Sequence, residues 1–258
     1  MPGFKFFKLS HADIYNQSAL ATISNNEALI QQLFNRDEYI AWESIGSNDD
    51  ETIVLEIDFG SARTFDCLIL NKTNLKAFNL EYFSGSWVTL LTVSDNLNST
   101  YYGKFPAVTA TLVRLSMIKT VIPNAEKTIQ DVVITEEIGQ LVGYPALRTT
   151  FARTKNTKEL INGKNKFLQK GRKLNFTLSF VDHVGTNDRA LFHTVTNLSE
   201  PFLLWPCGGN VEQFAYPDFG YRLEDLFLVQ VDENGYSHEF TKNLYKSGFR
   251  ASLRLKEA

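Results

Sequence analysis

The 258-residue chain lacks the segments that export a protein or insert it into a membrane. In Met1–Leu9, lysines interrupt the aromatic residues before a signal-peptide core of about 7 to 15 apolar residues can form. No stretch approaches the roughly 18 uninterrupted apolar residues that a membrane-spanning helix needs. We therefore expect no secretory signal and no membrane insertion.

Cysteine is scarce, with two residues in the whole chain. Cys67 lies in an apolar run, and Cys207 lies in a Pro-Cys-Gly-Gly turn. Two cysteines so far apart favour unpaired thiols in a reducing compartment over a disulfide, although a single bridge stays an alternative.

The motifs of common enzyme classes are also missing. The sequence has no HExxH, no GxSxG, no P-loop and no GxGxxG. The four histidines are not spaced as the ligands of a metal site are: His11, His183, His193 and His238. We expect a protein that is not an enzyme and that holds no cofactor and no metal, with an enzyme of unrecognised type as the alternative. Among the acidic turns, Ser47–Asp50 is the best candidate for a cation, but a solvated turn is the preferred interpretation.

Aromatic residues are abundant, with 20 Phe and 10 Tyr, which favours strands. Short segments with alternating or continuous apolar residues are separated by Gly, Asn, Ser and Asp. This pattern predicts an all-β, mainly antiparallel fold, because parallel sheets need connecting helices. The predicted strands are 52–59, 65–70, 78–83, 87–93, 111–117, 130–135, 174–180, 201–206, 226–231, 236–240 and 249–255. Helices are expected at Ser24–Tyr39, with Ser24 as a possible N-cap, and at Asn187–Asn197.

Charge divides the chain into two modules. Residues 1–140 hold 10 basic and 17 acidic residues, whereas residues 141–258 hold 16 and 12. Gly139, Gly143 and Pro145 mark the boundary between them. We predict one domain over 1–138 and a second over 146–258. Two β-hairpin turns are predicted in the second domain, at Asn162-Gly163 and at Asp232–Gly235.

The segment Arg148–Lys173 has nine basic residues against one acidic residue, Glu159. Nucleic acid, an anionic surface, an acidic protein neighbour and simple solvation are alternatives. We favour a protein neighbour over nucleic acid, because aromatic residues do not alternate with the basic ones as they do in a single-strand binder. The predicted partner-binding residues are Arg148, Arg153, Lys155, Lys158, Lys164 and Lys166.

The N-terminal module resembles the discoidin, or coagulation-factor type C, family of galactose-binding-like jelly-roll sandwiches. The resemblance rests on a helix at Asn26–Phe34, on Tyr39–Ser44 with its Trp, on the strand Val54–Phe59 followed by Gly60, and on Phe78–Trp87. It covers roughly residues 20–135 and implies carbohydrate or lipid binding. The terminal cysteine pair of secreted members is missing. The candidate sugar-binding residues are Trp42, Asn71, Lys72 and Asn74, although Trp42 and Trp87 also fit a buried core.

The C-terminal module resembles the β-rich domains of tailed-bacteriophage tail and baseplate proteins. A strand at Lys173–Phe180, a helix, the strand Glu200–Pro206 and a closing strand at Ser247–Leu255 carry the resemblance, over about 148–258. The two resemblances together predict a jelly-roll sandwich followed by a second β domain with one helix.

The predicted function is that of a structural subunit of a phage tail, baseplate or related injection apparatus. As such it would form a ring or adaptor, contact other tail proteins, and reside in the virion after assembly in the host bacterial cytoplasm. The alternative is a carbohydrate-binding, lectin-like module that contacts a cell-surface glycan.

Overall fold

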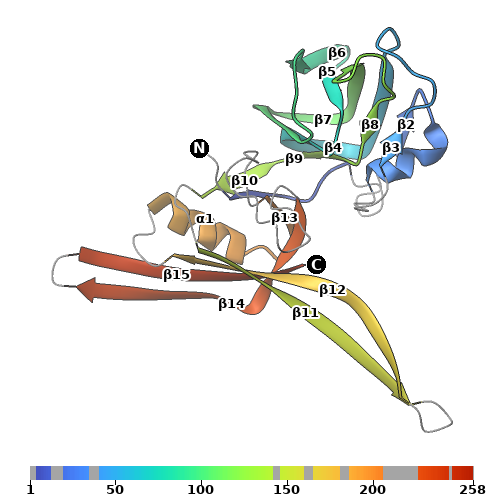
Figure 1. The fold of residues 1–258 in the computed structure, drawn as a ribbon. Helices are drawn as coiled ribbons and strands as arrows, with labels where there is room; N and C mark the ends of the chain where they lie inside the picture. The colour runs from blue at the N-terminus through green and yellow to red at the C-terminus, as the bar shows by residue number, and fades with distance from the viewer. Residues whose placement is uncertain are drawn as a thin grey trace. The chain divides into compact units, whose positions relative to one another are not determined.

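The computed structural model describes residues 4–12, 20–34, 41–141, 146–159, 165–180, 186–205, 226–243 and 246–257, and the statements below concern these residues. The chain divides into two compact units (Figure 1). Unit 1 comprises Met1–Phe6, Ile138–Gly208 and Leu226–Ala258. Unit 2 comprises Phe7–Glu137 and Gly209–Asp225. Unlike the predicted domains 1–138 and 146–258, this division gives the N-terminal residues to unit 1, because β1 (Lys5–Phe7) pairs within its sheet.

Unit 2 is built from antiparallel strands. One sheet has the order β2-β4-β7-β5-β6, with β9 paired to β4, and a second pairs β3 with β8. The elements are β2 (Leu20–Ile23), the 3-10 helix η1 (Glu27–Leu33), β3 (Trp42–Glu43), β4 (Ile53–Asn71), β5 (Leu75–Phe83), β6 (Trp87–Val93), β7 (Tyr101–Thr120), β8 (Thr128–Ile129) and β9 (Asp131–Thr135).

Strands β4 and β7 are the longest of unit 2 and pair with each other along two successive segments. The segment 53–58 pairs with 112–117, and the segment 63–70 pairs with 101–110, with a register shift between the two halves. Gly60 lies at this shift with φ of 70°, a conformation that glycine adopts without steric cost. Alternate residues of the first half, Ile53, Leu55 and Ile57, are fully buried and share one core with Leu68 of the second half. The result is the predicted jelly-roll sandwich.

Unit 1 contains a sheet with the order β10-β1-β13-β14-β15-β12-β11. Its remaining elements are β10 (Glu137–Gln140), β11 (Ala146–Glu159), β12 (Asn165–Phe180), the helix α1 (Thr186–Thr196), β13 (Phe202–Trp205), β14 (Phe227–Asn243) and β15 (Lys246–Glu257). The pairings among β11–β15 are antiparallel. Helix α1 contributes Phe192, which is fully buried with its ring 6.3 Å from that of Tyr236 in β14.

The structure confirms the all-β, mainly antiparallel fold class and the second domain with one α-helix. Both ends of this helix lie within one residue of the predicted ends, Asn187 and Asn197. The first predicted helix is shorter and of 3-10 type. The expected N-cap is wrong, since η1 begins after Asn26 without a side-chain cap. Ser24 instead accepts a hydrogen bond from the Val54 amide (3.0 Å). None of the described helices is long and apolar enough to cross a membrane.

The hairpin predicted at Asp232–Gly235 is also wrong. Strand β14 continues through these residues, and its register with β15 shifts between Val231 and Tyr236. The segment Asp232–Gly235, rich in turn-forming residues, therefore makes an irregularity within a paired strand, and the strands connect farther on, between Asn243 and Lys246. The other predicted turn, Asn162-Gly163, lies outside the described residues, although β11 and β12 on either side of it pair as a hairpin.

Candidate functional site

Four segments of unit 2 meet at one end of the sandwich, which we call the loop end: 44–50, 71–76, 94–100 and 120–128. Main-chain hydrogen bonds join the second segment to its neighbours, from the Thr73 amide to the Ser99 carbonyl (2.7 Å) and from the Val121 amide to the Asn74 carbonyl (2.9 Å). The Gly46 amide donates to a carboxylate oxygen of Glu126 (2.9 Å). The loop end is therefore one connected structure, and it contains the candidate sugar-binding segment.

Trp42 lies beneath this region in the core. Its side chain is 0% exposed, and its Nε1 donates a hydrogen bond to the Asn26 carbonyl (3.2 Å). Both faces of the ring pack within the protein, so Trp42 offers no surface on which a sugar could stack.

The two candidate asparagines bond to residues of the loop end and of the adjoining strand β9. Asn71 is buried and donates to an Asp131 carboxylate oxygen (3.2 Å). The Asn74 amide donates to the Glu126 carbonyl (2.7 Å) and accepts from the Thr128 amide (2.9 Å). These side chains hold the loops in place. Between them, Lys72 adopts φ of 47° at the turn.

The candidate cation loop at 47–50 is occupied by an ammonium group of the protein. Lys127 is fully buried, and its Nζ donates to the Asn48 carbonyl (2.6 Å). Burial lowers the pKa of Lys127, while the nearby carboxylates of Asp49 and Glu51 act in the opposite direction. Among the described residues, no group of His, Cys, Asp and Glu side chains is placed to hold a metal ion.

Aliphatic side chains project from three segments of the loop end. Ile45 is 67% exposed, Leu97 is 66% exposed and Ile122 is 71% exposed. Single exposed aliphatic residues are common on soluble proteins, but these three occur on loops that are hydrogen-bonded to one another.

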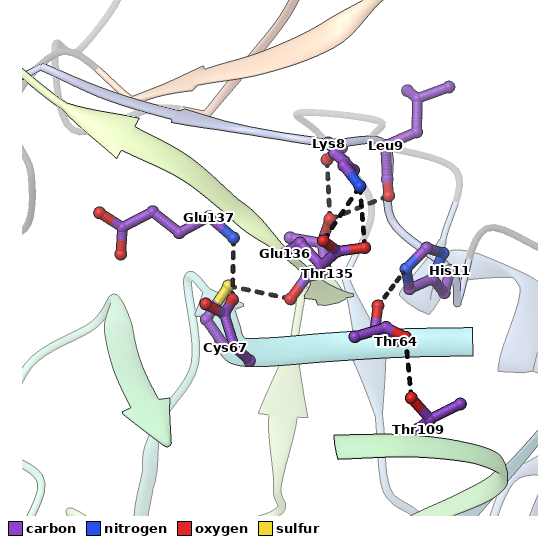
Figure 2. Close-up of polar contacts among 10 residues, drawn as sticks. Lys8, Leu9, His11, Thr64, Cys67, Thr109, Thr135, Glu136 and Glu137 are labelled. Atoms are coloured by element: carbon purple, nitrogen blue, oxygen red, sulfur yellow. Dashed lines mark hydrogen bonds and ion pairs between the residues drawn. The ribbon is translucent and has the colours of Figure 1, made fainter. Parts of the chain in front are cut away.

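Polar contacts elsewhere in unit 2 tie the strand β9 to the segment that precedes β2 (Figure 2). Thr135 Oγ1 donates to the carbonyls of Lys8 (2.9 Å) and Leu9 (3.0 Å), and the Lys8 ammonium pairs with Glu136 (2.9 Å). The Cys67 thiol donates to the Thr135 carbonyl (3.2 Å). Burial raises the pKa of Cys67 far above its usual value, which disfavours the thiolate form that a nucleophile requires. This cluster is therefore suited to holding the fold together.

In unit 1, β11 and β12 form an arm, defined as residues 151–159 and 165–174. Strand β15 pairs with β12 only from Asn175 onward, so the arm continues beyond it as a two-stranded ribbon (Figure 1). At about 3.3 Å per residue the ribbon extends roughly 30 Å. Most predicted partner-binding residues lie on β11 and β12, namely Arg148, Arg153, Lys155, Lys158 and Lys166, whereas Lys164 lies outside the described residues.

The register of the arm places basic residues opposite one another. Arg153 pairs with Arg172, and Lys158 pairs with Lys166. Like charges directly opposite each other destabilise an antiparallel pair. The charge of this segment can be read from its residues, but only the strand register shows which basic residues are opposed.

Sequence reasoning missed an aromatic surface on the outer face of unit 2. Phe83 and Trp87 are register partners on β5 and β6, with ring centroids 5.4 Å apart. A signal was present, because the alternation of Phe78, Leu80 and Tyr82 toward the core assigns Phe83 to the opposite face.

No family model matches the chain, and no curated protein matches it. Among solved structures, it is similar to chitosan-binding module 1 of a chitosanase/glucanase from Paenibacillus sp. IK-5, with 18% identity and a TM-score of 0.41 over 50% of this chain and 98% of that one. It is similar to a CBM32 module from Clostridium perfringens in complex with GalNAc-β-1,3-galactose, with 12% identity and a TM-score of 0.40 over 50% and 99%. A GH29 fucosidase from Ruminococcus gnavus has 13% identity and a TM-score of 0.41 over 50% and 26%.

The carbohydrate-binding modules in this set have the galactose-binding-like, discoidin-type fold that the N-terminal module was expected to have. The bacteriophage tail resemblance of the C-terminal module gains no support from the comparisons.

Proposed function

We propose that the protein is a non-enzymatic structural subunit that assembles into a homo-oligomer through the arm of unit 1. The observation that carries the proposal is the two-stranded ribbon with basic residues opposed across it. A two-stranded hairpin alone is marginally stable in water, and opposed like charges weaken it further. An acidic neighbour would relieve the repulsion and cover the open strand edges.

The charge of the chain supplies such a neighbour. Residues 1–140, which include most of unit 2, have 17 acidic against 10 basic residues. Contact between the arm of one copy and acidic surface of the next would join opposite charges, which speeds association and fixes register. The proposed setting is a phage tail or baseplate ring, and its support is the resemblance that the sequence of the C-terminal module carries.

The test compares the parent with the variant K155E/K158E/K166E by native mass spectrometry and size-exclusion chromatography at low and high salt. A control reverses three lysines of unit 2, in K72E/K76E/K119E. We expect an oligomer in the parent that weakens with salt, persists in the control and is lost in the arm variant. A monomeric parent at low salt, or an arm variant that assembles as the parent does, contradicts the proposal.

The setting is tested separately by electron microscopy of tailed virions with antibody against the protein. Labelling at the tail supports the assignment. Virions that contain the protein nowhere in the tail would remove it while leaving the oligomer proposal standing.

Carbohydrate binding by unit 2 is a second candidate function. The observation that favours it is the aromatic pair on the outer face of β5 and β6, where Phe83 is 41% exposed beside Trp87. A glycan array probed with the intact chain tests this function, and the absence of any binding would exclude it.

A further inference from the structure

The aromatic pair stands at the end of the β5–β6 hairpin. Phe83 and Trp87 face each other across a short turn in which Gly85 has φ of 78°. Their rings are inclined at 68° to each other, an edge-to-face arrangement. Neither residue belongs to the buried core, whereas their neighbour Tyr82 packs against it from the other side of the sheet. The hairpin therefore carries both residues on its outer face, where Phe83 is exposed and Trp87 is half-buried.

The adjacent strand β7 fixes the Trp87 ring. The guanidinium carbon of Arg114 lies 4.3 Å from the centre of this ring, and Arg114 Nε donates to a Glu81 carboxylate oxygen at 2.6 Å. Glu81 and Arg114 are register partners, so both backbones hold the ion pair in position. A ring held in this way loses little conformational entropy when a ligand binds to it.

Charge on this face limits the chemistry of a ligand. Arg114 has Glu81 opposite it on β5 and Glu56 opposite it on β4. Residues directly opposite in antiparallel strands lie on the same face, so this face carries two carboxylates and one guanidinium in one row across three strands. The local charge is negative, which disfavours acidic ligands and favours neutral or positively charged ones.

We propose that Phe83 and Trp87 form a stacking platform for a neutral or amino-substituted pyranose chain. The C–H face of a pyranose ring is apolar and slightly positive, and it complements the negative face of an aromatic ring. The Arg114 guanidinium covers one face of the Trp87 ring and is paired with Glu81, so the sugar would stack on the ring surface that Arg114 leaves uncovered. This inference rests on carbohydrate binding as the function of unit 2, and it places the ligand on the sheet face and not at the loop end.

The test is isothermal titration of the intact chain with three oligosaccharides: glucosamine, N-acetylglucosamine and galacturonate oligomers of equal length. Each is measured with the parent, with W87A, with W87F and with F83A. The variant I122A changes an exposed side chain at the loop end and is the matched control. Near-UV circular dichroism verifies that each variant keeps its fold.

We expect the glucosamine oligomer to bind at least as tightly as its acetylated form, and the acidic oligomer to bind most weakly. W87A weakens binding at least tenfold, W87F retains part of it because it keeps a ring, and I122A leaves it unchanged. If the parent binds no oligosaccharide on the array or in titration, carbohydrate binding itself fails. If the parent binds but W87A binds equally well, or if galacturonate binds best, the function stands and the platform is overturned.

Discussion

Replacing Trp42 with alanine distinguishes a core tryptophan from a sugar-stacking one. The side chain is fully buried, and its Nε1 donates to the Asn26 carbonyl (3.2 Å). Truncating a buried aromatic residue costs about 3–5 kcal/mol, and an internal hydrogen bond adds about 1 kcal/mol. For a unit of this size each kcal/mol shifts the melting temperature by roughly 3–5 °C, so a cost of about 4–6 kcal/mol predicts a decrease of roughly 12–30 °C.

The assay is differential scanning calorimetry. Hydrogen exchange of the β4 peptide 53–71 assigns the affected transition to unit 2, because a two-unit chain need not unfold in one step. W87A is the matched control, since it removes the same side chain from the outer face and costs about 1–2 kcal/mol in cross-strand and cation–π contacts. The melting temperature of W42F is expected to lie between those of W42A and the parent, and this variant serves as the test if W42A does not fold. A W42A transition within about 3 °C of the parent would refute the assignment of Trp42 to the core.

Three further predictions concern the backbone, a thiol and a histidine. G235A destabilises unit 1 by more than 1 kcal/mol in urea denaturation, because a Cβ at Gly235 would lie 2.6 Å from the Arg254 carbonyl oxygen; equal stability would contradict this crowding. In a C207S background, Cys67 reacts with a thiol reagent only after unfolding, since it is buried with a raised pKa, and rapid native labelling would contradict its burial. Burial lowers the pKa of His11, so its neutral form is favoured in the fold, and the resulting stability is lost as pH falls below about 6.5. H11Q should therefore flatten the stability curve between pH 5 and 7, and an unchanged slope would exclude His11 as its source.

Much of the fold was predictable because strand patterns are local. A period-two alternation needs only a few residues and one buried face, and Val54–Phe59, Phe78–Phe83 and Trp87–Val93 all lie in strands of the structure. Helix α1 was predicted because its sequence pattern is also local. The hairpin prediction at Asp232–Gly235 failed because the outcome there depends on a distant strand. Turn-forming residues permit both a hairpin and an irregularity within a strand, and the partner β15 decides between them.

The candidate sites divide along the same line. Several features can be read from the sequence by itself: the acidic first half, the basic segment at 148–173, the two distant cysteines and the aromatic-rich strands. Tertiary structure decided which side chains face water. It buried Trp42, displayed Phe83 and Trp87 and filled the candidate cation loop with the ammonium of Lys127, because exposure depends on packing between strands far apart in sequence. It also decided that most of the basic segment forms a two-stranded ribbon. Strand β15 pairs with β12 only from Asn175 onward, and where this pairing stops depends on residues about 80 positions farther along the chain.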